Sequence, residues 1–182
     1  MAQGIIDALR RDHDEVRALF DRLQAASGKQ RRELFQQLVG ELVRHEVAEE
    51  EILRPVSKRD AGAAIANARI KEESQAEALL KEMEKLDPGS AEFLSKLARL
   101  QREVERHAEA EETKEFPRVA AKETTERLER MGRAYEAAKL ATPTRPHPAT
   151  PNTPVANMLV GPFAAVIDRA RDAVRDALKS TS

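Results

Sequence analysis

Apolar residues recur every three or four positions along four long segments of this chain, and this spacing predicts four amphipathic α-helices. The segments run over residues 5–23, 30–55, 60–86 and 90–116. Turn-forming glycine, proline and serine residues separate them, and Ser90 is a favourable N-cap for the last. A shorter helix is predicted over residues 124–141.

The connections between these segments are short, which favours helices that pack antiparallel to their neighbours along the chain. We therefore predict an all-α fold: an antiparallel up-and-down four-helix bundle with an additional helix after it. Residues 1–141 form this domain.

A proline-rich stretch and one more amphipathic segment follow the predicted bundle. Residues 142–161 read as an extended linker, because five prolines crowd into its first part. Residues 162–182 then predict a C-terminal helix. Its apolar face carries Phe163, Val166, Ile167, Ala170, Val174 and Leu178. We expect this face to dock on the chain's own bundle or on a second subunit.

The composition and net charge limit the partners, the location and the metal ligands that we expect. Only 3% of the residues are aromatic, while 35% are charged, as in helices rich in alanine and leucine. A net charge of -1 gives no reason to expect nucleic acid or anionic membranes as partners. No apolar run approaches the roughly 18 residues of a membrane span, and no leader precedes the first helix, so we expect a cytoplasmic protein. With no cysteine, the strong metal ligands available are His, Asp and Glu.

Three of the four histidines interrupt the apolar faces of predicted helices. His13, His45 and His107 keep the three-or-four spacing of their apolar neighbours, so they point toward the core. Glu49 and Glu111 follow two of these histidines by four residues. A His and a Glu at this spacing lie about 6 Å apart on one helix face, within reach of one metal ion or a bridged pair.

A metal ion would explain why carboxylates face the core, because an unpaired buried carboxylate is costly. The third helix contributes Glu73, with Glu77 as an alternative. A solvated acidic face is the competing interpretation of that helix. A lone histidine such as His13 is by itself more often structural. His147 falls in the proline-rich stretch and is not expected to be a ligand.

Around these residues the sequence resembles the hemerythrin-like, or HHE cation-binding, family over residues 5–140. The resemblance is carried by His13, by HEVAEEEILRP at 45–55, by HAEAEETKEFP at 107–117, and by KEESQAEALLKEMEKLDPG, which is similar to the family's third helix and turn. It implies a four-helix bundle around two iron ions with an oxo or hydroxo bridge. The implied ligands are His13, His45, His107 and the bridging Glu49 and Glu111. Manganese and zinc fit similar donors. The linker and C-terminal helix are similar to those of actinobacterial members.

The sequence departs from the family pattern in two regions. Glu73 and Glu77 stand where the family usually places one or two histidines, and Arg54 stands where many members have an aromatic residue. Carboxylate in place of imidazole favours the ferric state of iron, which suits the consumption of oxidants better than the release of unchanged oxygen.

The leading hypothesis is therefore a diiron protein that consumes peroxide, as a catalase or peroxidase does, or a related oxidant such as nitric oxide. The alternative is a protein that binds or senses oxygen or iron without turnover. A metal-free helical interaction module is the third class. Tyr135, the only tyrosine, is expected to serve in core packing.

Overall fold

The structure, a computed structural model, describes residues 4–141 and residue 172. The predicted linker over 142–161 and nearly all of the predicted C-terminal helix over 162–182 lie outside the described residues. The helices are α1 (Ile5–Ala25), α2 (Gly28–Ile52), α3 (Arg54–Ser57), α4 (Ala63–Met83), α5 (Ala91–Ala110), α6 (Phe116–Ala120) and α7 (Thr125–Ala141), with π-helical turns η1 (Lys58–Gly62) and η2 (Glu111–Glu115).

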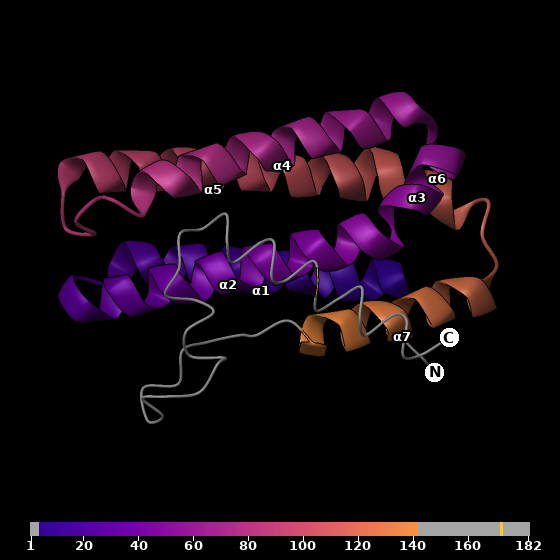
Figure 1. The fold of residues 1–182 in the computed structure, drawn as a ribbon, viewed down its shortest axis with the longest axis horizontal. Helices are drawn as coiled ribbons and strands as arrows, with labels where there is room; N and C mark the ends of the chain where they lie inside the picture. The colour runs from indigo at the N-terminus through magenta and orange to yellow at the C-terminus, as the bar shows by residue number, and fades with distance from the viewer. Residues whose placement is uncertain (1–3, 142–171, 173–182) are drawn as a thin grey trace.

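The predicted all-α bundle is confirmed. Helices α4 and α5 lie side by side along one flank, and α1 and α2 lie along the other (Figure 1). Helix α7 packs against α1 and α2 on the side away from α4, as the additional helix. The α1–α2 and α4–α5 connections lie at the same end of the bundle, the end shown on the left in Figure 1. Within the described residues, no helix is long and apolar enough to cross a membrane.

The two predicted proline boundaries are not simple helix ends. Helix α2 ends at Ile52, and the chain continues through α3, where Pro55 occupies the first turn and needs no hydrogen-bond partner for its nitrogen. Pro117 has the same position in α6, after the π-helical turn η2. The third long helix begins at Ala63 rather than near residue 60, because η1 precedes it. Gly62 closes η1 with a φ of 104°, which favours glycine.

The end of the bundle where α1 joins α2 and α4 joins α5 has an apolar core. Phe35 and Phe93 meet there edge to face, with ring centroids 5.0 Å apart. Leu38, one turn after Phe35, is fully buried. Leu97 and Leu100, one and two turns after Phe93, are fully or almost fully buried. This packed end fixes the relative positions of α2 and α5 before either helix reaches its histidine.

Ser90 caps α5 as predicted: its hydroxyl accepts a hydrogen bond of 3.1 Å from the backbone nitrogen of Phe93. We expect Ser90→Ala to lower the free energy of unfolding by about 1 kcal/mol, measured by urea denaturation of the metal-free protein. The matched control is Ser74→Ala, because the exposed Ser74 hydroxyl bonds only to the Ile70 carbonyl within α4. The control should be as stable as the wild type or slightly more stable. Equal losses in both variants would contradict a specific capping role.

Candidate metal centre

The structure brings the predicted donors together from five elements. His13 lies midway along α1, and α2 contributes His45 and Glu49 from successive turns. Glu73 comes from α4, and His107 and Glu111 lie where α5 passes into η2. Their donor atoms form two groups, in each of which all atoms lie within 4.8 Å of one another: His13, His45 and Glu111, and Glu49, Glu73, His107 and Glu111. Glu111 belongs to both groups.

Each histidine is held from behind through its Nδ1 atom. His13 Nδ1 lies 2.8 Å from Glu112 Oε1, and His107 Nδ1 lies 3.1 Å from Glu72 Oε2. His45 Nδ1 lies 3.0 Å from the Tyr135 hydroxyl. The carboxylate oxygens and the Tyr135 hydroxyl oxygen can accept hydrogen bonds, so we assign a proton of each imidazole to Nδ1, which leaves Nε2 as the ring atom available to a metal ion.

The Nε2 atoms point inward at the shared carboxylates. Glu111 Oε2 lies 3.3 Å from His13 Nε2, and Glu111 Oε1 lies 3.0 Å from His107 Nε2. His45 Nε2 lies 3.5 Å from Glu49 Oε2. Three Nε2 atoms and two carboxylates thus converge, which is the arrangement of ligands around metal ions.

Tyr135 does more than the core packing expected of it. It is fully buried, and its hydroxyl donates a 2.6 Å hydrogen bond to Asp12 Oδ2, which also accepts from Lys139 Nζ. Burial by itself raises the pKa of Asp12, but hydrogen bonds from His45, Lys139 and Tyr135 bring it far below the ordinary value. Burial and Asp12 raise the pKa of Tyr135 well above its ordinary value. Tyr135 therefore remains a neutral phenol that connects Asp12 to His45.

The carboxylates of the second group surround the side chain of Arg54. Arg54 is 2% exposed, and its Nη2 lies 2.5 Å from Glu73 and 3.4 Å from both Glu49 and Glu111. Burial raises the pKa of Glu49 well above its ordinary value, and the neighbouring Glu111 adds to this effect. For Glu111, burial acts in the same direction, but His107 and other partners bring its pKa well below the ordinary value.

Several buried atoms at the centre have no hydrogen-bond partner within the described residues. They are His13 Nε2, Glu111 Oε2 and both carboxylate oxygens of Glu49. A buried polar atom without a partner is costly, and bound cations can satisfy these atoms, since His13 belongs to one donor group, Glu49 to the other and Glu111 to both. The residues present therefore fit a metal ion. Their imidazole and carboxylate donors are those used for iron, manganese and zinc.

The structure separates the two candidates on the third helix. Glu73 reaches the second donor group, whereas Glu77 forms an ion pair of 3.1 Å with Lys81 and belongs to neither group. Glu112 is half-buried against His13 and Arg17. Glu72, placed off the inward face by its spacing, holds His107.

Glu115 is a buried carboxylate that the sequence reasoning missed. It is fully buried and accepts a hydrogen bond of 3.0 Å from Arg54 Nη1. A signal was present, because the inward spacing of His107 and Glu111 continues to position 115.

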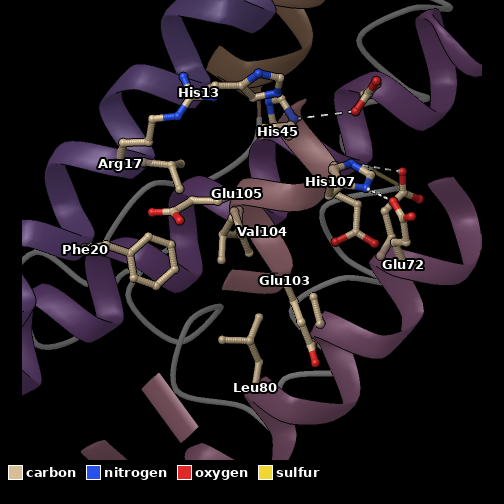
Figure 2. Close-up of a pocket in the computed structure, with 17 residues that line it drawn as sticks. His13, Arg17, Phe20, His45, Glu72, Leu80, Glu103, Val104, Glu105 and His107 are labelled. Atoms are coloured by element: carbon tan, nitrogen blue, oxygen red, sulfur yellow. Dashed lines mark hydrogen bonds and ion pairs between the residues drawn. The ribbon is translucent and has the colours of Figure 1, made fainter. Parts of the chain in front are cut away.

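A cavity of about 60 Å³ adjoins the donor groups. Figure 2 shows the three histidines at one end of it and Phe20, Val104 and Leu80 toward the other. A space of this size holds a few water molecules or a small oxidant directly beside the inward Nε2 atoms. The apolar residues that line it are Val16, Phe20, Leu42, Ala76, Leu80, Val104 and Ala108.

Comparison with known proteins finds a matching family model and two relatives. The model of the hemerythrin HHE cation-binding domain matches residues 4–139. A hemerythrin-like protein of Schizosaccharomyces pombe is 27% identical over 172 residues, which cover 92% of this chain and 85% of that protein. A DNA nickase of Nostoc sp. is 30% identical over 137 residues, which cover 75% of this chain and 39% of the nickase.

A solved structure shares the fold. The crystal structure of a hemerythrin HHE cation-binding domain-containing protein from Mycobacterium kansasii aligns with a TM-score of 0.72 at 18% identity, covering 96% of this chain and 99% of the other.

The unpartnered oxygens of Glu49 predict how the metal-free protein responds to their loss. We expect Glu49→Gln to raise the free energy of unfolding by about 1 kcal/mol or more, measured by urea denaturation with a chelator present, because it removes a buried negative charge at nearly constant shape. Glu33→Gln is the control, since Glu33 is exposed and pairs only with the exposed Lys29. It should change stability by less than about 0.5 kcal/mol. A destabilised Glu49→Gln variant would contradict the argument.

Proposed function

The chain belongs to the hemerythrin HHE cation-binding domain family, and from that premise we propose that its His and Glu cluster binds two iron ions and consumes hydrogen peroxide or a related oxidant such as nitric oxide. The observation that carries this proposal is the pair of donor groups that share Glu111. The two oxygens of Glu111 face different histidines, so one carboxylate can serve both groups.

The ligand assignment follows from the grouping. His13 and His45 would hold one ion with one oxygen of Glu111. Glu49, Glu73 and His107 would hold the other with the second oxygen. The support behind each imidazole keeps its Nε2 turned inward, which reduces the reorganisation that binding requires.

Iron is proposed because carboxylates predominate in the second group. Three carboxylates and one imidazole form a hard, anionic donor set, which stabilises ferric over ferrous iron. Such a set supports reaction with an oxidant better than reversible oxygen carriage. Bound iron would supply Lewis acidity and the electrons exchanged with peroxide.

The protein's own part in this reaction is to admit a small molecule and to keep the donors in place. The apolar side chains of Phe20, Val104 and Leu80 limit the water that reaches the inward Nε2 atoms. On the other side of the site, Tyr135 and Asp12 keep the His45 ring oriented with its proton on Nδ1. No nuclease activity is proposed, because 31 basic and 32 acidic residues leave no excess positive charge for phosphate.

Metal content tests the binding part of the proposal. We expect the wild type, loaded anaerobically with ferrous iron and desalted, to retain up to two iron ions per chain by elemental analysis. His107→Ala and Glu49→Ala should each retain less, because each removes an inward donor. His147→Ala is the matched control and should retain the wild-type amount. Retention of iron by all the variants alike would place the binding site elsewhere.

Oxygen evolution tests the chemistry. Iron-loaded wild type should release oxygen from hydrogen peroxide. Glu49→Ala and His107→Ala should lose at least about 90% of the rate, because removing a direct ligand lowers activity by at least the roughly tenfold that removing a ligand's hydrogen-bond partner does. The rate is measured with an oxygen electrode against the same amount of free iron. A stable, reversible oxygen-bound spectrum without turnover would refute peroxide consumption and favour an oxygen-binding or sensing protein.

A further inference from the structure

Arg54 places a permanent positive charge inside the second donor group. Its Nη2 lies within 3.4 Å of three of the four members of that group: Glu49, Glu73 and Glu111. A guanidinium does not lose its proton inside a protein, and this one is buried. Its charge therefore already compensates carboxylates that the proposed second ion would use.

The first donor group is nearly free of this competition. Within the described residues, His13 and His45 form no hydrogen bond or ion pair with Arg54. The oxygen of Glu111 that faces His13 is Oε2, whereas Arg54 approaches Oε1. A cation in the first group consequently meets an unpartnered Nε2 and an unpartnered carboxylate oxygen. A cation in the second group must share its carboxylates with a guanidinium.

Glu115 is a carboxylate outside the donor groups toward which the Arg54 guanidinium can move. Arg54 Nη1 already donates to Glu115 Oε1 at 3.0 Å, and Glu115 is outside both donor groups. Arg54 Nε and Glu115 Oε2 are both buried and have no hydrogen-bond partner within the described residues. A small shift of the guanidinium toward Glu115 could bring Nη2 to Glu115 Oε2, so that Nη1 and Nη2 donate in parallel to both oxygens of Glu115.

We infer that Arg54 is an internal competitor for the second metal ion, so the two groups bind metal with unequal affinity. The group of His13, His45 and Glu111 fills first. The group of Glu49, Glu73 and His107 fills only as Arg54 withdraws onto Glu115. This inference rests on the proposed two-ion site.

Titration with manganese(II) tests the inference, because this ion does not require an oxidant-free assay and its free form is counted by electron paramagnetic resonance. The full chain should bind one manganese ion tightly and a second more weakly. Arg54→Met should tighten the second step by about tenfold or more and leave the first unchanged, because it removes a cation at contact distance from three ligands. Glu115→Gln should weaken the second step, because it removes the partner that receives Arg54.

Thermal unfolding supplies a readout that does not depend on turnover. Metal-free Arg54→Met should melt below the wild type, because the buried carboxylates lose their counter-ion, and manganese should raise its melting temperature more than that of the wild type. Arg31→Met is the matched control: Arg31 is a partly buried arginine that donates to the Pro88 carbonyl, in the α4–α5 connection, away from the site. It should leave both binding steps unchanged.

The outcomes are distinguishable. Equal affinities in the wild type, or a second step that is the same in Arg54→Met and Glu115→Gln as in the wild type, would overturn the inference and make Arg54 a structural ion pair only. The Glu115→Gln result stands on its own if Arg54→Met fails to fold without metal. Absence of any bound manganese or iron in the wild type would instead overturn the proposed function.

Discussion

Glu49 and Glu111 place two carboxylates inside the bundle, at 1% and 0% exposure, where an ionised group is unfavourable without a nearby cation. Arg54 and His107 compensate part of this charge, yet both Glu49 oxygens and one Glu111 oxygen remain without hydrogen bonds. A fold that only needed stability would fill these positions with leucine, as it does at Leu97 and Leu100 earlier along α5. The centre is therefore a region where stability is given up for the capacity to bind a cation.

The residues behind the histidines hold the imidazoles in place although the centre itself lowers stability. Glu112, Glu72 and the Tyr135–Asp12 pair each hold one Nδ1 atom, so the inward orientation of every imidazole is set by a partner on another element. The apolar end around Phe35 and Phe93 fixes the helices independently of the centre. Burial and rigidity thus come from different parts of the bundle, and the donors can remain unsatisfied while the helices stay in place.

Periodicity along single helices was enough to predict the bundle and the inward direction of His13, His45 and His107, because both depend on spacing within one element. It could not identify Glu72 or Asp12 as partners of the centre, because their roles depend on which helices become neighbours. It could not identify Glu112 as the partner of His13 either, because the π-helical turn η2 changes the angular register just after α5. The ligand roles of the donors remain predictions.

The two departures from the family pattern, at Glu73 and at Arg54, compensate each other in charge. Glu73, in place of a neutral histidine, adds a negative charge to the second donor group, and Arg54, in place of an aromatic residue, adds a positive one. The two side chains lie 2.5 Å apart. Glu73 without Arg54 would be a half-buried carboxylate without its guanidinium partner, at considerable cost, whereas Arg54 without Glu73 would still contact Glu49, Glu111 and Glu115. Together, Glu73 and Arg54 keep the net charge of the group constant. They also replace an imidazole donor with a carboxylate that is already paired with Arg54. This pairing makes the second group harder in its donor chemistry and less available to a cation than the first, so an asymmetric centre follows from two compensating residues.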